Sequence, residues 1–319
     1  MKKRCLVTGV NGFLGQALAN RLLTEGYEVY GLYQIKDNPK NDKVIPFFAD
    51  LTDFKEIEYM IIKLQPQIVI HLAAKTEVAY SFDNYLEVSK VNYLGTVNLA
   101  EANRKLNHSL ELFIFASTME TYGQHNRKSY GAFTEDTKQF PRAPYAVAKV
   151  ACEYYLKYMY SAYKFPFVAL RQTNTYGRYD NDFFIMERII TQMLKSDVCK
   201  LGVPEPWRNF LYVDDLIDLY VTLLKHEPRK DILGEFFVTG PDNALSICSL
   251  AEKIKEKLDW HGKIVWGTRP ILPGEVYYLN SNPAKAKKIL GWEPKIDLKE
   301  GIERAIKIWK ANYAKDEGK

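Results

Sequence analysis

The sequence of 319 residues predicts an α/β fold, with a doubly wound parallel sheet and a smaller C-terminal α/β lobe. Short β-branched and aromatic runs alternate with longer helical patterns over the first two thirds of the chain, as in successive βαβ units. The runs at residues 67–72 and 110–116 are almost continuously apolar, which is typical of strands that helices cover on both faces. After about residue 173 the alternation gives way to segments rich in glycine, proline and aromatic residues, which indicates a second lobe.

The individual elements follow from these runs. We expect strands at residues 4–8, 28–33, 44–48, 67–72, 110–116, 167–171 and 235–239. We expect helices near residues 13–25, 53–64, 84–106, 145–163, 214–225, 283–290 and 298–312. Because the last strand follows the start of the second lobe, residues 1–173, completed by about 211–240, are expected to form one domain, and residues 174–210 and 241–319 the other.

Composition and charge exclude several classes of protein. The four cysteines (Cys5, Cys152, Cys199, Cys248) are scattered, and neither they nor the five histidines show metal-ligand spacing, so we expect reduced thiols and no metal. The net charge of +5 comes from lysines interleaved with acidic residues, which argues against nucleic acid as a partner. No apolar run approaches the roughly 18 residues of a membrane span, so we expect a soluble cytoplasmic protein with no membrane partner.

Glycines lie between the first expected strand and the first expected helix. In the segment TGVNGFLG they allow the backbone to approach a pyrophosphate, while the helix N-terminus supplies N–H groups and partial positive charge. The spacing is GxxGxxG rather than GxGxxG, and its place between strand and helix gives the pattern its weight. The sequence therefore predicts a Rossmann-type dinucleotide site with contacts from Gly9, Asn11, Gly12, Phe13, Leu14 and Gly15.

Two further positions bear on the dinucleotide. Asp50 and Leu51 follow the third expected strand, where a carboxylate and a backbone N–H could meet an adenine, although an Asp there is more often a helix cap and Asp53 is the better cap candidate. A ribose-binding acid is expected about 20 residues past the glycines. The second strand instead runs into Tyr33-Gln34-Ile35-Lys36, and Lys36 could face a 2′-phosphate, so NAD and NADP both stay open.

Tyr145 and Lys149 open a helix after Pro144. Residues four apart share a helix face, so the ammonium is expected to favour the phenolate and to lower the pKa of Tyr145 below the usual value of about 10. A phenol tuned in this way is a usable acid and base near neutral pH.

The same YxxxK pattern occurs at Tyr59 and Tyr160, where we interpret it as a coincidence of amphipathic helices. Tyr145 differs because it comes one unit after the strand at 110–116. That strand ends in STMETYG (117–123) at the carboxyl edge of the sheet, where ligands of such folds bind.

Eight motifs occur in a characteristic order: TGVNGFLG, HLAA (71–74), VNYLGTVNL (91–99), STMETYG, PYAVAK (144–149), NTYG (174–177), RNFLYVDD (208–215), and PGE (273–275) with LGW (290–292). In these motifs the sequence resembles the extended short-chain dehydrogenase/reductase superfamily, over essentially its whole length. Within the superfamily it is most similar to the NAD(P)-dependent nucleotide-sugar epimerases and dehydratases, and closest to the 4,6-dehydratases.

The resemblance implies roles for residues in these motifs. Tyr145 would take the proton of a sugar 4-hydroxyl, Lys149 would hold the nicotinamide ribose and tune the phenol, and Thr118 would bond to the reacting oxygen. Further contacts to NAD or NADP would come from Leu72, Ala73, Ala74 and Asn92. The diphosphate of the sugar nucleotide would be bound by Asn174, Arg208 and Arg269, as suits the guanidinium fork.

Glu120 lies where the family's 4,6-dehydratases keep the base that removes the C5 proton. Those enzymes carry an acid or a serine between the threonine and the glutamate, whereas this chain has Met119, whose thioether donates no proton. Either Glu120 or a water then protonates the departing 6-hydroxyl, or elimination does not occur. The sequence favours a 4,6-dehydratase. The alternatives are a 4-epimerase or 4-keto-sugar reductase and, in a different class, a dinucleotide-binding sensor without turnover, which would not need to keep Thr118, Tyr145 and Lys149.

The expected partners are a nucleotide-diphosphate sugar and a second copy of the chain. The base pocket is expected within residues 182–206, which contain no readable specificity code. The resemblance implies that the helices near 84–106 and 145–163 pair across a two-fold axis to form a homodimer. Their aromatic and apolar side chains Tyr154, Tyr155, Tyr158 and Met159 could form that interface or equally be part of the core.

Overall fold

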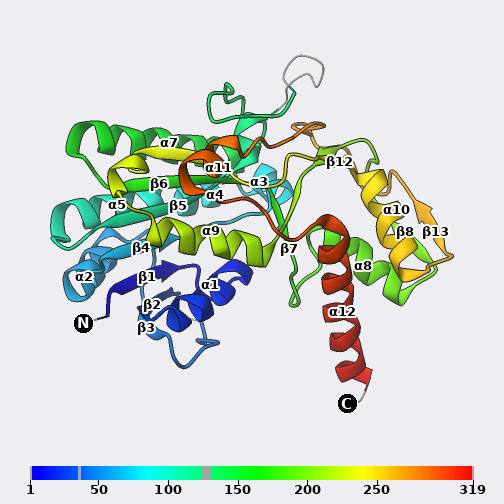
Figure 1. Ribbon diagram of the computed structural model, residues 1–319, viewed down its shortest axis with the longest axis horizontal. Helices are drawn as coiled ribbons and strands as arrows, with labels where there is room; N and C mark the ends of the chain where they lie inside the picture. Colours follow the sequence, from blue (N-terminus) through cyan, green and yellow to red (C-terminus); the bar gives the residue numbers. More distant parts are fainter. Residues whose placement is uncertain (1, 35–36, 124–130, 318–319) are drawn as a thin grey trace. The chain divides into compact units, whose positions relative to one another are not determined.

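The structure is a computed structural model that describes residues 2–34, 37–123 and 131–317 (Figure 1). It divides into two compact units. Unit 1 contains residues 1–123, 138–172 and 220–237, and unit 2 contains residues 124–137, 173–219 and 238–319. The chain therefore passes between the units several times. Residues 131–137 and 211–219 cluster with unit 2, and the expected domain bounds, which assigned them to the first domain, stay a prediction.

A seven-stranded sheet forms the centre of unit 1, in the order β11-β6-β5-β4-β1-β2-β3. The strand pairs from β3 to β6 are all parallel. The chain order reverses between β1 and β4, and in open α/β sheets ligands bind at such a switch point, beyond the carboxyl ends of the strands. The strands are β1 (Arg4–Thr8), β2 (Glu28–Tyr33), β3 (Ile45–Phe48), β4 (Ile68–His71), β5 (Leu112–Thr118), β6 (Phe167–Gln172) and β11 (Glu235–Val238).

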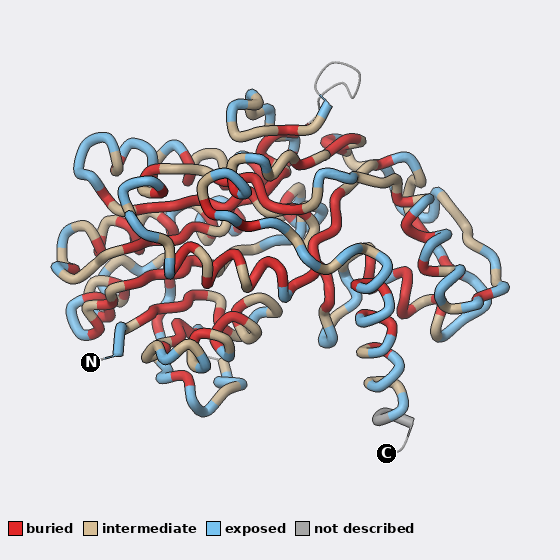
Figure 2. The backbone as a smooth tube through the Cα atoms, in the orientation of Figure 1, coloured by how far each residue is buried: buried red, intermediate tan, exposed pale blue. Residues whose placement is uncertain are grey.

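Helices cover both faces of the central strands. Every residue of β4 and all but one residue each of β5 and β6 are buried, and Figure 2 shows the buried backbone running through the strands. On one side α5 packs against both α2 and α7, and α1 lies beside α9, where Glu25 pairs with Lys225. The helices are α1 (Phe13–Thr24), α2 (Phe54–Leu64), α3 (Val78–Asp83), α4 (Tyr85–Ser89), α5 (Gly95–Leu106), α7 (Pro144–Tyr163) and α9 (Val213–Lys225).

The helix ends are set by local chemistry. The Asp53 side chain accepts the N–H groups of Lys55 and Glu56 and so begins α2, as expected for an N-cap aspartate. Pro144 stands in the first turn of α7, where a missing N–H does not weaken the helix. Gln65 and Lys164 end α2 and α7 in the left-handed conformation. The helix expected near residues 84–106 is divided by η1 (Lys90–Leu94), a π-helical segment.

Unit 2 combines helices with three two-stranded sheets, β7 with β10, β9 with β12, and β8 with β13. Its strands are β7 (Asn174–Tyr176), β8 (Val198–Lys200), β9 (Trp207–Arg208), β10 (Phe210–Tyr212), β12 (Leu245–Ser246) and β13 (Lys263–Val265). Its helices are α8 (Ile185–Lys195), α10 (Ile247–Leu258), α11 (Ala284–Leu290), α12 (Leu298–Glu317) and the first part of α9. The short η2 (Met119–Tyr122) belongs to unit 1 and η3 (Arg229–Asp231) precedes β11.

The expected α/β class and doubly wound sheet are confirmed, and each expected strand and helix of the sheet domain is found within a few residues of its predicted bounds. The structure adds α8, α10 and the short strands of unit 2, which the sequence analysis did not predict. Over the part of the chain that the structure describes, no helix is long and apolar enough to span a bilayer.

Candidate active site

In the glycine loop between β1 and α1, two of the three glycines have no room for a side chain. Gly9 lies in the left-handed region at φ +68°, and a Cβ there would come within 2.8 Å of the Ala73 nitrogen. A Cβ at Gly15 would overlap the Gly9 carbonyl oxygen. At Gly12, by contrast, a Cβ would have one neighbour within 4 Å among the described residues, the Gly9 oxygen at 3.2 Å. Of the three glycines, Gly12 is therefore on the more open face of the loop.

The N-terminus of α1 suits an anion. No side chain caps the helix at Gly12, and its first turn contains no acidic residue. The first N–H groups of a helix have no partner within it, and the helix dipole places partial positive charge there. The open face of the loop and this helix end fit the diphosphate of a dinucleotide. Direct contacts from Asn11, Phe13 and Leu14 stay a prediction.

Asn11 ties the glycine loop to the segment after β2. Its Nδ2 donates to the Asn38 carbonyl at 3.0 Å, and its Oδ1 accepts the Lys40 N–H at 3.3 Å. The backbone after β2 is thus held against the glycine loop, as it must be to line a ribose site.

Gln34 stands at the end of β2, where a ribose-binding acid was expected. Its N–H donates to the Asp37 carboxylate at 3.0 Å, so the nearest acid in the sequence is engaged with the backbone of this turn. Ile35 and Lys36, the lysine considered for a 2′-phosphate, lie outside the described residues.

Asp50 and Leu51 follow β3, as expected. The Asp50 carboxylate accepts the Thr52 N–H at 2.8 Å, and the buried Leu51 lies close to Gly95 of α5, where a Cβ would come within 3.2 Å of it. The Leu51 carbonyl accepts from the Asn98 side chain at 3.0 Å. An adenine contact at Asp50 and Leu51 stays a prediction.

A buried polar network holds the loop after β4 against the glycine loop. His71 Nδ1 lies 2.7 Å from the Thr8 hydroxyl, and Nε2 lies 2.9 Å from the Thr96 hydroxyl. Thr8 Oγ1 also accepts the Ala73 N–H at 3.0 Å. Burial, helped by the charge of Lys149, lowers the pKa of His71 to about 3, so the imidazole is neutral at pH 7. The network fixes Ala73, between Leu72 and Ala74, beside Gly9.

Asn92 lies in the π-helical segment η1 and clamps the same loop. Its side chain accepts the Lys75 N–H at 2.7 Å and donates to the Lys75 carbonyl at 2.9 Å. Its own carbonyl accepts from the Thr96 hydroxyl at 2.6 Å and from the Cys152 thiol at 3.2 Å. Single π turns are frequent at functional sites. Asn92 therefore shapes the loop in this structure, while direct contact with a dinucleotide stays a prediction.

The candidate catalytic side chains gather at the carboxyl end of β5. The Tyr145 phenol is hydrogen-bonded to the Thr118 hydroxyl, which also accepts the Glu120 N–H at 3.2 Å. The Glu120 carboxylate is near enough to act on Tyr145 through its charge. Lys149, one turn along α7, donates to the Ala116 carbonyl at 2.7 Å. The structure thus brings Thr118, Glu120 and Tyr145 into one cluster and places Lys149 beside it.

The expected fall in the pKa of Tyr145 is wrong for this structure. Burial raises the pKa of Tyr145 above its usual range, the bond with Thr118 opposes that rise, and the Glu120 charge adds to it. The Lys149 ammonium points to a backbone carbonyl and is not among the groups that shift the phenol. Helical spacing predicts a shared face, but it does not predict how deeply the face is buried.

Lys149 is itself perturbed. Its side chain is buried, its Nζ lies 4.6 Å from the centre of the Phe115 ring, and burial lowers its pKa to about 8. Cys152 and Glu153 oppose that fall. The lysine is still charged at pH 7, but a modest rise in pH removes its proton.

The two other tyrosine–lysine pairs are different in kind. In both, the lysine lies over the ring of its own tyrosine, at 5.5 Å for Lys63 over Tyr59 and 5.5 Å for Lys164 over Tyr160. Tyr59 is exposed, and Lys164 is the residue that ends α7. Neither pair lies at the carboxyl edge of the sheet.

Sequence reasoning missed two buried charges near the site, Glu153 and Arg171. They form an ion pair at 2.8 Å between α7 and the end of β6. Glu153 is four residues past Lys149, so a charged side chain on the buried face of α7 was the available signal. His71 was noted only as part of a motif, although it organises the loop after β4.

In unit 2 the expected substrate residues already have protein partners. The Arg208 guanidinium donates to the Trp207 carbonyl at 2.9 Å and to the Val276 carbonyl at 2.8 Å. Arg269 forms a bidentate ion pair with the Glu275 carboxylate, at 2.9 and 3.0 Å. Asn174 begins β7 and pairs in register with Phe210.

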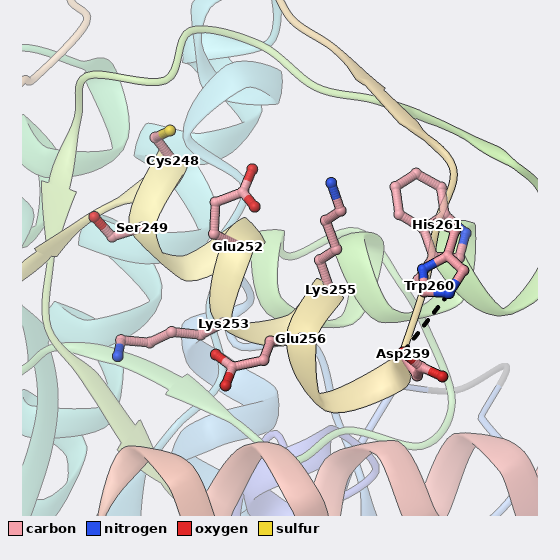
Figure 3. A pocket seen from close by; sticks show the side chains of 9 residues that line it. All are labelled: Cys248, Ser249, Glu252, Lys253, Lys255, Glu256, Asp259, Trp260 and His261. Carbon is pink, nitrogen blue, oxygen red and sulfur yellow. Dashed lines mark ion pairs between the residues drawn. The ribbon is translucent and has the colours of Figure 1, made fainter.

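Other features lie apart from these residues. An open hollow on α10 and the turn after it is lined by nine residues, including the pair Asp259 and His261 at 3.8 Å, and contains none of the candidate site residues (Figure 3). The four cysteines are free, and three of them are buried. Within residues 2–34, 37–123 and 131–317, no group of three His, Cys, Asp or Glu side chains could hold a metal ion.

Comparison with known proteins agrees with this geometry. The model of the family described as GDP-mannose 4,6 dehydratase matches residues 6–305. The chain is 29% identical to the dTDP-D-glucose 4,6-dehydratase of Homo sapiens, with 98% of this chain and 91% of that protein covered.

Solved structures of epimerases are also similar. The UDP-glucose 4-epimerase of Thermotoga maritima, solved with UDP-glucose, superposes with a TM-score of 0.88 at 26% identity, over 97% of this chain and 99% of that one. The UDP-glucuronic acid 4-epimerase of Bacillus cereus, solved with UDP-glucuronic acid and NAD, gives a TM-score of 0.86 at 25% identity, over 97% of this chain and 100% of that one.

Proposed function

On the premise that the chain belongs to the GDP-mannose 4,6 dehydratase family, within the extended short-chain dehydrogenases/reductases, we propose that it is a nucleotide-sugar 4,6-dehydratase. It is an NAD(P)-dependent enzyme of the nucleotide-sugar dehydratase and epimerase type. Within that type, we propose that it eliminates water from its substrate.

The position of Glu120 supports this proposal. A 4-epimerase needs groups that move the proton of the C4 hydroxyl, and Thr118 and Tyr145 supply them. A dehydratase needs in addition a base for C5. Glu120 is that extra carboxylate, since its N–H donates to the Thr118 hydroxyl and its charge acts on Tyr145.

The proposed reaction assigns one proton to each group. A bound nicotinamide ring supplies a reversible acceptor for the C4 hydride. Tyr145, as the phenolate, takes the proton of the 4-hydroxyl, Thr118 holds the same oxygen, and Lys149 binds the nicotinamide ribose. The resulting 4-ketone acidifies C5.

Glu120 then takes the C5 proton, the C6–O bond breaks, and the 6-hydroxyl leaves as water. Because Met119 cannot donate a proton, we assign the proton on the leaving oxygen to Glu120 as well. The hydride adds to C6 and a proton adds to C5, which gives a 4-keto-6-deoxy sugar without net change in the cofactor.

We assign dinucleotide binding to unit 1, with Gly9, Gly12 and Gly15 at its diphosphate, and nucleotide-sugar binding to unit 2. Arg208 and Arg269 are the proposed cations for the sugar-nucleotide diphosphate. Asn174, which occupies a matching motif position of the family, is proposed to assist them. Arg269 is paired with Glu275 in this structure. When the sugar nucleotide binds, the Arg269 guanidinium would exchange the Glu275 carboxylate for phosphate oxygens, which are also negatively charged.

A second copy of the chain is the proposed partner. On α7, Tyr154 and Tyr158 are 68% and 49% exposed, whereas Tyr155 is partly buried and Met159 is buried, so the first two are the side chains available for a homodimer. Sedimentation of the wild type should give a dimer mass, and Tyr154→Lys should shift it towards the monomer. A wild-type mass of one chain at every concentration rules the dimer out.

Mass spectrometry of the product decides among the activities. Wild-type enzyme, supplied with each common nucleotide hexose in turn, should convert one of them to a product lighter by one water, with no added reductant consumed. Isomerisation alone would identify a 4-epimerase, and stoichiometric use of NADH or NADPH would identify a reductase. Tight dinucleotide binding without any product would identify the non-catalytic sensor.

A further inference from the structure

The buried Glu153 joins four segments of unit 1. Its carboxylate accepts from Ser117 at the end of β5 at 2.5 Å and from Gln139, ahead of α7, at 2.6 Å. Arg171, at the end of β6, donates to it at 2.8 Å through Nη2. Glu153 is 2% exposed and Arg171 is 6% exposed, so the pair is shielded from solvent and keeps a fixed geometry.

Arg171 extends this arrangement to the turn that carries Glu120. Its Nη1 donates to the Tyr122 hydroxyl at 2.8 Å, and the guanidinium lies 5.1 Å from the centre of the Tyr122 ring. The guanidinium also lies 4.8 Å from the centre of the Phe236 ring. Tyr122 is fully buried and is the last residue of η2, two residues after Glu120.

The turn is held at both ends. At its start the Thr118 hydroxyl accepts the Glu120 N–H. After it, Gly123 lies at φ +61°, and a Cβ there would overlap the Phe140 carbonyl, while the Phe140 N–H donates to Thr121 at 3.1 Å. The Glu120 backbone is thus fixed by Thr118 before it and by Tyr122 and Gly123 after it.

We propose that Tyr122, anchored by the Arg171–Glu153 ion pair, is a positioning residue that holds the Glu120 carboxylate over C5 of the substrate. The inference rests on the proposed function, because it gives Glu120 a step of its own. Tyr122 touches no reacting atom. Its effect is on one half of the reaction, since Thr118 and Tyr145 have their own supports on β5 and α7.

Tyr122→Phe tests the proposal, because it removes only the hydroxyl that Arg171 donates to and leaves the ion pair intact. Tyr220→Phe is the matched control. Tyr220 is also fully buried, and its hydroxyl accepts from Gln172 at 2.6 Å rather than from Arg171. Direct removal of Glu153 or Arg171 would leave an unpaired buried charge and could unfold the protein.

Two readouts separate this proposal from the proposed function. In single turnovers, Tyr122→Phe should form reduced dinucleotide within twofold of the wild-type rate but release water roughly tenfold more slowly, as a small misplacement of a base would cause. Hydrogen exchange of the peptide that spans residues 117–123 should be faster in Tyr122→Phe and unchanged in Tyr220→Phe, whatever reaction the enzyme performs.

The outcomes are distinct. If Tyr122→Phe slows dinucleotide reduction and water release equally, or slows neither, the positioning role is overturned. It is also overturned if hydrogen exchange of residues 117–123 is the same in Tyr122→Phe as in the Tyr220→Phe control. If the wild type releases no water from any nucleotide hexose, the proposed function is wrong, and exchange alone then decides whether Tyr122 holds the turn.

Discussion

At the scale of single residues, burial outweighs the partner charges at this site. The sequence predicted Tyr145 and Lys149 as neighbours on one helix face, and the structure confirms that both lie at the start of α7. It could not predict the direction of the Tyr145 shift, because burial depends on what packs over the helix. Both side chains are buried, so the neutral form of each is favoured, and the pKa of the phenol rises while that of the amine falls.

The pKa of Lys149 predicts an upper pH limit for activity. The amine is charged below its pKa of about 8 and neutral above it, so the charge that we propose for binding the nicotinamide ribose is present at pH 7 and lost as pH rises. We expect kcat/KM to fall above pH 8, by about tenfold per pH unit.

Lys149→Arg provides the control, because a guanidinium stays charged throughout that range. Its activity should be low, since the two side chains differ in shape, but level from pH 7.5 to about 9.5. The same alkaline decline in the arginine variant would assign the titration to a group other than Lys149.

At the scale of elements, local sequence predicts the sheet domain well and unit 2 poorly. The glycine loop, the two apolar central strands and the Pro144 helix start each carry a signal within a few residues. In α8 the buried Met186, Ile189, Ile190 and Met193 have helical spacing, and Ser246 caps α10, so both helices had signals that the sequence analysis passed over. Strands of two or three residues leave no periodicity to detect.

The three-glycine loop predicts opposite results for two similar substitutions. Gly12→Ala places a methyl 3.2 Å from the Gly9 oxygen, a contact that a small shift relieves, at a backbone conformation that alanine adopts, so the free energy of unfolding should fall by no more than about 1 kcal/mol. Gly15→Ala pushes a methyl into the Gly9 carbonyl and to 2.7 Å from the Val10 Cα, which should cost about 2–4 kcal/mol.

Binding separates the two variants further. Fluorescence titration with NADH and NADPH should show at least a roughly tenfold loss of affinity in Gly12→Ala, because its methyl stands where the diphosphate approaches. The same titration of the wild type identifies the preferred dinucleotide. Unchanged affinity in Gly12→Ala would mean that the open face of the loop is not the diphosphate site.

At the scale of the whole molecule, the sequence predicted a two-part chain with several crossings, because a strand signal follows the start of the second lobe. The long-range partners could not be read from it. The pair Glu153–Arg171 joins residues 18 positions apart, and the bond from Arg171 to Tyr122 spans 49. Such contacts arise from the order of strands in the sheet, not from spacing along one helix. The candidate catalytic residues could therefore be proposed from motifs, whereas the contacts that hold them could be identified only from the fold.

The central claim is that Glu120 removes the C5 proton after oxidation at C4. The most direct measurement is mass spectrometry of the sugar nucleotide formed in D2O by the wild type and by Glu120→Gln, with dinucleotide reduction followed by absorbance. The account predicts a wild-type product that has lost one water and carries deuterium at C5, and a variant that reduces the dinucleotide without releasing water. Water loss by Glu120→Gln at the wild-type rate, or simple isomerisation by the wild type, would contradict it.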